Sequence, residues 1–389
     1  MLNNYMGIIY MSAPFENIRS LTKIRPLASI PVGGSYRIID FSLSNLINAG
    51  VKNVGIFGGA EDLDSLIDHL GNGAEWNLNR KKDGIFIFER MTDSFFSTNM
   101  KRLKKNIEYF VRSIQKNVII MSSHMVCNID MEDVIKNHEA SGKEITVVYK
   151  HVSNASEKFD NCDCVKVNKN SEVEGIGQNL FFRDKEKISL EIFVLSKELM
   201  IKLICDGIQE GTYFSGRELI NSNIPKYRVN GYEFKGYLSC INSTKEYFDF
   251  NMDLLNKEVR DDLFSQPRRS IYTKVKDTPP TLYQKGADIK NSLVSNGCIL
   301  AGKVRNSILA RGTIVEEDAI IEDCIILQGT VIRSGAILKN IIVDKNNEIK
   351  SNERLSASKN YPLVVEKALK LDKKYFQEIL NKLENMVAD

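Results

Sequence analysis

A repeat with a period of six residues dominates the C-terminal part of the chain. Glycine and asparagine fall between its apolar positions, which are Ile308, Ile314, Ile320, Ile326, Ile332 and Leu338. A helix repeats about every 3.6 residues and a strand every two, so neither explains this period. A coil with three short flat faces does, because it stacks one apolar residue per face inward. The repeat predicts a left-handed parallel β-helix over residues 287–368, with Val315, Ile321 and Leu327 as a competing inward set.

Short apolar runs alternate with helix-like stretches before this repeat. Such alternation predicts an α/β fold with a mainly parallel, doubly wound sheet, which we place at residues 1–240. The predicted strands are Met6–Tyr10, Asn53–Phe57, Ile85–Phe88, Asn117–Met121 and Glu144–Tyr149. The predicted helices are Ile38–Ala49, Leu63–Leu70, Asn99–Ile114 and Met131–Ala140, the last with Asp130 as its N-cap.

Two segments connect and end these parts. Residues 241–286 contain one predicted helix, Lys245–Glu258, and a polar linker with three prolines. Residues 369–389 place Phe376, Ile379 and Leu383 on one helical face, with Lys and Glu opposite. We therefore expect a C-terminal amphipathic helix that docks on this chain or on a partner.

Composition excludes several classes of protein. The net charge of +3 over 389 residues, with both signs interspersed, does not make a nucleic-acid-binding surface. The seven cysteines contain no C-x-x-C pair, which indicates reduced thiols rather than a metal site. No signal peptide and no apolar run of membrane-spanning length is present, so we expect a cytoplasmic protein without membrane contact.

The stretch "RPLASIPVGGSYRIIDFSLSNLINAGVKNVGIF", Arg25–Phe57, is the most specific in the sequence. It resembles the start of the glucose-1-phosphate adenylyltransferase family, the ADP-glucose pyrophosphorylases, which make the glucosyl donor for glycogen. His69–Asn77 and Tyr247–Leu255 resemble two further blocks of that family, and the six-residue repeat is similar to its C-terminal domain. The resemblance implies a Rossmann-like nucleotidyltransferase domain followed by a β-helix.

The residues that serve catalysis in this family are replaced here. In the family, glucose 1-phosphate attacks the α-phosphate of ATP, and two aspartates hold Mg²⁺. The family loop Gly-Gly-x-Gly-Thr-Arg corresponds to Ser12–Asn17, which has no glycine and contains the anion-repelling Glu16. Ser123 and Cys240 stand at the positions of the metal-binding aspartates. Neutral Ser and Cys do not hold Mg²⁺ between phosphates, so we expect no catalytic residue, metal or cofactor.

The resemblance therefore points to the non-catalytic, regulatory subunits of the bacterial enzyme, the GlgD type. It implies a homologous catalytic adenylyltransferase subunit as partner, in a heterotetramer, with a homo-oligomer as the state of the isolated chain. It also implies a sugar-phosphate or nucleotide effector.

Candidates for binding a ligand or the partner lie in the family-like stretch, whereas the basic run Lys101, Arg102, Lys104 and Lys105 either receives a phosphorylated effector or is a solvated helix face. Gly33 and Gly34 are either ligand contacts or a tight turn with positive φ. Arg37 and Asp40 either contact a phosphate or the partner, or form an ion pair at the start of a helix. His124 is either a relic of the family's active site or a hydrogen-bonded core histidine.

Two enzymatic functions remain as alternatives. One is an active sugar-1-phosphate nucleotidyltransferase with atypical ligands, which needs Mg²⁺ and ATP. The other is an acyltransferase, a chemistry that six-residue β-helices often serve with a histidine general base. The second ranks last because every histidine lies outside residues 287–350: His69, His124, His138 and His151.

Overall fold

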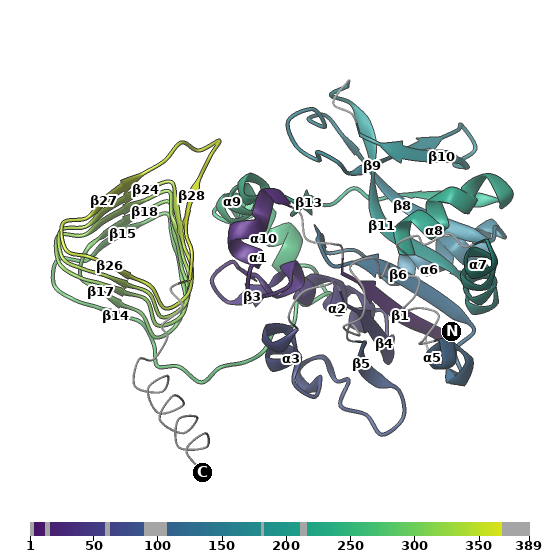
Figure 1. The fold of residues 1–389 in the computed structure, drawn as a ribbon, viewed down its shortest axis with the longest axis horizontal. Helices are drawn as coiled ribbons and strands as arrows, with labels where there is room; N and C mark the ends of the chain where they lie inside the picture. Colours follow the sequence, from purple (N-terminus) through teal and green to yellow (C-terminus); the bar gives the residue numbers. More distant parts are fainter. Residues whose placement is uncertain are drawn as a thin grey trace, which may run out of the picture.

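The computed structural model describes residues 4–11, 16–58, 63–88, 107–179, 183–210 and 216–367. Figure 1 shows an α/β domain with a three-sided β-helix beside it. The predicted tail helix 369–389 and most of the Ser12–Asn17 segment lie outside the described residues. Among the described residues, no helix combines the length and the apolar character that a membrane span needs.

The N-terminal domain is built on a nine-stranded mixed sheet. Seven strands follow the order β10-β9-β11-β6-β1-β4-β5, while β8 pairs with β11 and β12. The strands are β1 Tyr5–Tyr10, β4 Asn53–Phe57, β5 Gly84–Phe88, β6 Asn117–Ser122, β8 Ile145–Val152, β9 Asp163–Val167, β10 Val173–Gln178, β11 Glu186–Ser196 and β12 Val229–Glu233. The central strands β6, β1, β4 and β5 are parallel, and β11 is antiparallel to its neighbours. The α/β prediction and all five predicted strands are confirmed, with small differences at the ends.

Helices cover both faces of this sheet. Alternate residues of β1 point to opposite faces, so Ile9 packs with α2, α3 and α6, whereas Ile8 packs with α5, α7 and α8. The helices are α1 Arg19–Thr22, α2 Ile38–Asn48, α3 Asp64–Leu70, α5 Ile107–Arg112, α6 Met131–Ser141, α7 Lys197–Gln209 and α8 Gly216–Asn223. Asp130 caps α6 as predicted, because its side chain accepts the backbone N–H groups of Glu132 and Asp133. Residues 99–106 of one predicted helix lie outside the described residues.

The connectivity of the sheet fixes where a ligand site is expected. The chain runs outward from β1 through β4 to β5 and then returns to β6 on the other side of β1. Open α/β sheets bind ligands beyond the carboxyl ends of the strands at such a reversal. Tyr10 and Ser122 are paired at this point.

The predicted helix Lys245–Glu258 is wrong as a single element. The structure has two helices, α9 Thr244–Asp253 and α10 Lys257–Phe264. Asn256 leaves the helical conformation and its side chain accepts the backbone N–H of Glu258, so it begins a new helix where the sequence pattern continued the first. Two-residue strands complete the domain in two small sheets: β2 Pro31–Val32 with β3 Tyr36–Arg37, and β7 Met125–Val126 with β13 Ser239–Cys240.

The C-terminal repeat forms three parallel five-stranded sheets, which confirms the predicted β-helix. One sheet consists of β14 Leu282–Tyr283, β17 Ile299–Leu300, β20 Ile314–Val315, β23 Val331–Ile332 and β26 Glu348–Ile349. The second consists of β15 Asp288–Lys290, β18 Lys303–Arg305, β21 Ile320–Glu322, β24 Ile337–Lys339 and β27 Arg354–Ser356. The third consists of β16 Leu293–Val294, β19 Ile308–Leu309, β22 Ile325–Ile326, β25 Ile341–Val343 and β28 Leu363–Val365. The first strand precedes residue 287, so the coil starts slightly earlier than expected.

The inward register mixes the two apolar sets. Val315 and Ile321 are buried in the coil, whereas Ile320 is 37% exposed. Ile321 pairs with Leu338, which is seventeen residues further on and also buried. One turn of the coil therefore does not contain three full six-residue faces, and a strict period of six drifts by one residue per turn. Leu327, from the second set, packs instead against the N-terminal domain.

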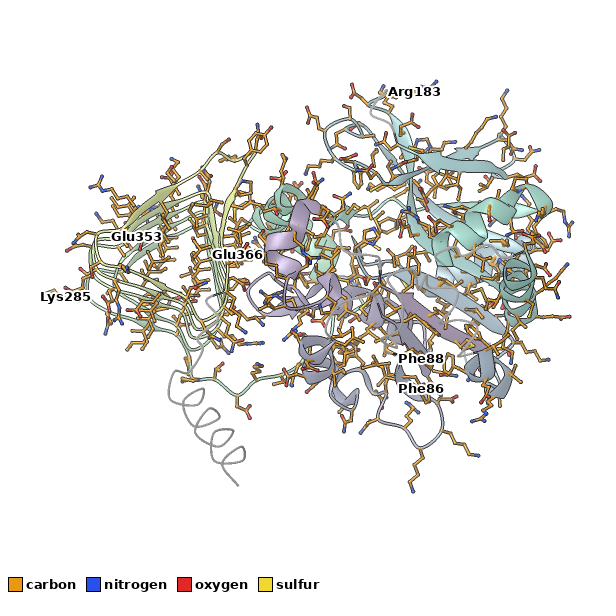
Figure 2. All side chains as sticks on the ribbon, in the orientation of Figure 1. Phe86, Phe88, Arg183, Lys285, Glu353 and Glu366 are labelled. Carbon is orange, nitrogen blue, oxygen red and sulfur yellow. The ribbon has the colours of Figure 1, made fainter. Side chains whose placement is uncertain are left out.

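The sheet that ends in β28 faces the N-terminal domain (Figure 1). Its Leu327 and Ile342 share an apolar cluster with Phe41 and Phe250. A buried ion pair, Arg25 with Asp344, crosses the same interface. Figure 2 shows Glu366 on this side, whereas Lys285 and Glu353 lie on the far side of the β-helix. Apolar packing and a buried ion pair thus fix how the two domains sit.

Candidate functional site

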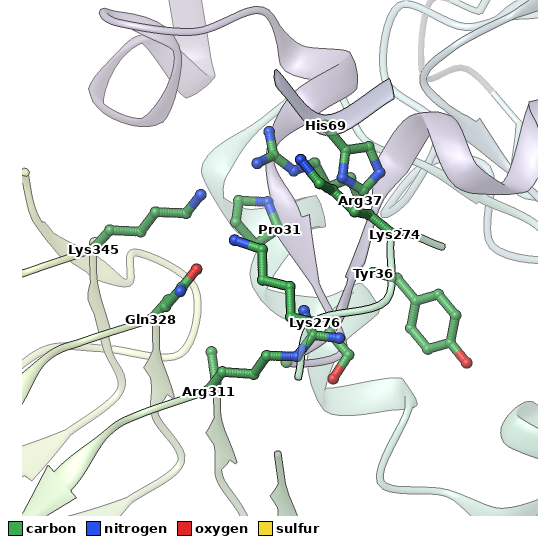
Figure 3. A pocket seen from close by; sticks show the side chains of 12 residues that line it. Pro31, Tyr36, Arg37, His69, Lys274, Lys276, Arg311, Gln328 and Lys345 are labelled. Atoms are coloured by element: carbon green, nitrogen blue, oxygen red, sulfur yellow. The ribbon is translucent and has the colours of Figure 1, made fainter. Parts of the chain in front are cut away.

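A small pocket, with a cavity volume of about 30 Å³, lies between the two domains (Figure 3). Its lining comes from the β2–β3 hairpin, α3, the linker and the turns of the β-helix: Pro31, Gly34, Ser35, Tyr36, Arg37, His69, Lys274, Lys276, Ala310, Arg311, Gln328 and Lys345. Five of these described residues are Lys or Arg, and none is acidic. The pocket is suited in charge to an anion, and we call it the basic pocket.

The hairpin turn brings the backbone of the N-terminal domain against the β-helix. Gly33 and Gly34 have φ of 57° and 76°, the left-handed region that a tight turn requires. A Cβ on Gly34 would lie 2.5 Å from Ser295 Oγ, so a side chain there would push the domains apart. Gly33 donates its N–H to Asn251 Oδ1 at 3.0 Å. Only Gly34 of the two lines the basic pocket.

Arg37 and Asp40 are both held by other groups. The Arg37 guanidinium donates to Ser29 O at 3.1 Å and to Ser65 O at 2.8 Å. One Asp40 oxygen accepts the Arg37 backbone N–H, and the other lies 2.6 Å from His69 Nε2. Asp40 is fully buried and does not line the pocket, whereas Arg37 does. Asp40 therefore positions its neighbours at the start of α2.

Three cations of the basic pocket have no such support. Among the described residues, none accepts a hydrogen bond from the side chains of Lys276, Arg311 or Lys345. Figure 3 shows Lys345 and Arg311 extending from the β-helix toward Arg37 and Lys276 of the other wall. Burial and the nearby Arg37 and Arg25 lower the pKa of Lys345 to about 7. Burial also lowers the pKa of Arg37 and Arg311. A bound anion would relieve this accumulation of positive charge.

The sequence named Arg37 as a binding candidate but missed the other four cations. They come from the linker and from two turns of the coil that lie far from Arg37 along the chain. No local motif marks Lys276, Arg311 or Lys345. They meet only because the β-helix docks on the hairpin.

A second cluster lies at the carboxyl ends of β1 and β6, where the sheet topology places a ligand. Ser123 donates its backbone N–H to Tyr10 O at 3.1 Å, and Ile241 donates to His124 O at 2.9 Å. Ser123 and Cys240, the residues at the expected metal positions, therefore lie on either side of His124. Both are about 1% exposed.

Polar side chains in this cluster satisfy one another. Tyr10 donates to Glu191 at 2.6 Å, and Arg217 donates to the other Glu191 oxygen at 2.8 Å. His124 Nε2 lies 3.7 Å from Glu191, and Arg217 lies 3.4 Å from Asp163. Glu191 and His124 are almost fully buried. The carboxylates nearest the family's catalytic position are thus already paired with internal cations.

The charges of this cluster follow from these contacts. Burial opposes ionisation of Glu191, but His124 and Arg217 outweigh it and lower the Glu191 pKa. Burial opposes the charged form of His124 too, and Glu191 outweighs it and raises the His124 pKa. Burial alone would raise the pKa of Cys240, but hydrogen bonds from Cys162 and His124 lower it to about 6. His124 is therefore a buried, hydrogen-bonded histidine.

Comparison with known proteins gives two matching family models. Residues 16–175 match the nucleotidyl transferase family, and residues 280–360 match the GlmU-like C-terminal hexapeptide family. The glycogen biosynthesis protein GlgD of Bacillus subtilis (strain 168) is 36% identical over 321 residues, which cover 81% of this chain and 82% of that protein. The GlgD protein of Geobacillus stearothermophilus is 33% identical over 324 residues, 82% of this chain and 83% of the relative. The glucose-1-phosphate adenylyltransferase of Mycoplasma mobile is 25% identical over 325 residues, 80% and 84% of the two chains.

Proposed function

Since the chain belongs to the nucleotidyltransferase family that includes the glycogen biosynthesis protein GlgD, we propose that it is a regulatory, non-catalytic subunit. It binds a catalytic glucose-1-phosphate adenylyltransferase of the same fold in a hetero-oligomer and modulates the synthesis of ADP-glucose for glycogen. Its own site takes a phosphorylated effector rather than the substrates.

One observation carries the non-catalytic part, namely the self-paired cluster beyond β1 and β6. Nucleotidyl transfer needs carboxylates that are free to hold a metal across the reacting phosphates. Ser123 and Cys240 offer a hydroxyl and a thiol instead, and Glu191 is engaged by Tyr10 and Arg217. Withdrawing Glu191 to bind a metal would leave the Arg217 charge without that partner, at a cost of several kcal/mol.

The residues present do not fit a Mg²⁺–nucleotide complex. Mg²⁺ prefers carboxylate and water oxygens in octahedral geometry, whereas this position presents Cys240 Sγ, His124 and the paired Glu191. Within the described ranges, no group of three or more His, Cys, Asp or Glu side chains is arranged to hold a metal ion. Among the described residues, the alternative of an active transferase with atypical ligands therefore lacks a set of metal donors.

The basic pocket supports the regulatory part. Its cations come from both domains, so an anion bound there joins the β2–β3 hairpin and the linker to the coil. A ligand shifts a conformational equilibrium only when it binds one arrangement more tightly than another, and a site shared between two domains meets this condition. Arg37 contributes one of these contacts, and Gly34 allows the close approach.

We also propose four units: the nucleotidyltransferase-like domain 1–240, the helix and linker 241–286, the β-helix 287–368 and the C-terminal helix 369–389. We further propose that the protein is cytoplasmic. The seven free cysteines favour a reducing compartment. Limited proteolysis that cuts first between residues 264 and 282, outside the helices and strands, would support the linker.

Pyrophosphate release tests the proposal. The chain alone, a catalytic homologue alone and the two co-purified are compared with ATP, glucose 1-phosphate and Mg²⁺. We expect no turnover from this chain, and a changed rate or substrate affinity in the complex. Removing one stabilising contact from a transition state typically costs about a hundredfold in rate, so losing several leaves nothing measurable.

Two outcomes would contradict the proposal. Mg²⁺-dependent turnover by the isolated chain, lost in an Arg217→Met variant, would restore a catalytic function. The regulatory role would be refuted if the complex and the catalytic homologue alone have the same rate and substrate affinity, both with and without inorganic phosphate. An Arg311→Met variant should abolish the phosphate response, whereas Lys303→Met, on an exposed face of the coil, should retain it.

A further inference from the structure

A second groove between the domains has no role in the function proposed above. It has a cavity volume of about 680 Å³ and shares no lining residue with the basic pocket. The start of α9, the loop before β9 and the last turn of the coil line it: Asn17, Ser20, Glu157, Asp160, Asn242, Ser243, Thr244, Lys245, Glu246, Asn360, Tyr361, Pro362, Leu363 and Val364. We call it the polar groove.

The charge of the polar groove is opposite to that of the basic pocket. Three of its residues, Glu157, Asp160 and Glu246, carry carboxyl groups. Its cation Lys245 is already paired with Asp249, one turn along α9. A phosphorylated ligand would meet these acids without a free cation to bind it.

Two residues of the groove, Glu246 and Asp160, have carboxyl oxygens that no described residue contacts by a hydrogen bond. Glu246 is only 7% exposed, and no described residue donates to its carboxyl group. Asp160 is half-buried; the backbone N–H of Asn161 hydrogen-bonds to its carboxylate, and only its buried Oδ1 lacks a partner. Native structures seldom leave buried polar atoms unsatisfied, because each costs about 1–3 kcal/mol. The groove therefore has hydrogen-bonding capacity that the chain does not use.

These groups suit a ligand that both donates and accepts hydrogen bonds. Burial and the neighbouring Asp249 raise the pKa of Glu246 to about 7, so near neutral pH it is present in both protonation states. Burial raises the pKa of Asp160 too. A protonated carboxyl donates one hydrogen bond and still accepts others, as a hydroxyl does. The side-chain amides of Asn17 and Asn360 add further donors and acceptors.

An aromatic ring stands beside these polar groups. Tyr361 is 82% exposed, and its backbone N–H is bound to Ser358 O at 3.1 Å, which fixes the turn before β28. Exposed aromatic rings offer a flat apolar face with little loss of side-chain freedom. A pyranose ring has an apolar C–H face and equatorial hydroxyl groups at its edge, and it matches this combination.

We propose that the polar groove binds a neutral oligosaccharide, with one pyranose ring against Tyr361 and one of its hydroxyl groups on Glu246. The ligand lies between α9 of the N-terminal domain and the last turn of the coil. Binding therefore links the two domains at a second place, independently of the anion in the basic pocket. This inference does not depend on the absence of catalysis.

Isothermal titration of the full chain with maltotetraose tests the proposal. We expect saturable binding that weakens about tenfold or more in Tyr361→Ala, which alters an exposed side chain and leaves the core intact. Tyr283→Ala is the matched control, because Tyr283 is also an exposed tyrosine of the coil, at 56%, but lies outside the groove. Glu246→Gln keeps a donor and an acceptor and should bind nearly as well, whereas Glu246→Leu should lose about tenfold.

Several results would overturn the proposal. These are no saturable binding of maltotetraose, an equal effect of Tyr361→Ala and Tyr283→Ala, or spermidine displacing the sugar through the acidic residues. Inorganic phosphate is titrated in parallel as a probe of the basic pocket. A normal phosphate response without sugar binding would refute the polar groove alone and leave the regulatory proposal intact.

Discussion

Replacing Lys345 by methionine should stabilise the protein in the absence of anions and weaken its response to them. Lys345 is largely buried beside Arg37 and Arg25, and its pKa falls from 10.5 to about 7. At about 1.4 kcal/mol per pKa unit, this shift corresponds to about 5 kcal/mol of unfavourable interaction of the charged form. Part of the side chain remains in water, which screens it, so we expect a gain of about 2 kcal/mol for Lys345→Met at pH 7.

The pH dependence gives this prediction a defined sign. Between pH 7 and 10.5 the unfolded chain keeps the Lys345 proton while the folded chain releases it, so the unfolded state binds more protons. Wild-type stability therefore rises with pH through this window as the penalty disappears. The advantage of Lys345→Met should be largest at or below pH 7 and should shrink toward pH 10.5.

Thermal unfolding in an anion-free buffer measures the effect. A gain of about 2 kcal/mol should raise the melting temperature by about 2–3 °C in a chain of this size. Inorganic phosphate should then stabilise the wild type more than the variant, because a ligand of the folded state adds stability by mass action. Lys303→Met, at an exposed coil position, is the control and should change neither quantity. The reasoning fails if Lys345→Met melts no higher than the wild type at pH 7, or if phosphate stabilises both equally.

Two further predictions concern buried groups elsewhere. In a urea titration, Asp344→Asn should lower the free energy of unfolding by about 3 kcal/mol, because it leaves Arg25 buried without its charged partner. The control Glu366→Gln, at the exposed pair with Lys23, should lower it by less than about 1 kcal/mol. Equal losses in the two variants would contradict this prediction. The ultraviolet absorbance of the native protein should show one thiolate forming near pH 6, and this transition should be missing in Cys240→Ser. If the substitution leaves the titration unchanged, the hydrogen bonds from Cys162 and His124 do not lower the Cys240 pKa.

The α/β domain illustrates which features local sequence determines. Five strands and the N-cap of α6 followed from apolar runs and from Asp130, because burial and capping act within a few residues. The break between α9 and α10 did not follow from the pattern, since Phe248 and Leu255 continue one apolar face across it. Asn256 ends that continuity by capping a new helix, and only the folded backbone reveals this choice.

The inward register of the coil shows a similar limit. A period of six residues identified the β-helix, but Ile320 points outward and Ile321 inward. Ile314 stacks on Ile299, fifteen residues earlier, whereas Leu338 stacks on Ile321, seventeen residues earlier, so the stacking of one turn on the next selects the register. Leu327 fits neither set of apolar positions predicted to point into the coil, because it packs against the N-terminal domain.

The sequence by itself determined the two folds and their order, and it predicts the loss of the catalytic carboxylates. These features depend on which residue type stands at each position, so a periodic pattern and a family resemblance are enough to predict them. The tertiary structure decided where the remaining charges meet. Arg37, Arg311 and Lys345 lie far apart along the chain, and Glu246 and Tyr361 do too. The residues of each set come together only because an apolar interface and the buried Arg25–Asp344 pair dock the β-helix on the sheet domain. Such long-range packing leaves no local pattern in the sequence.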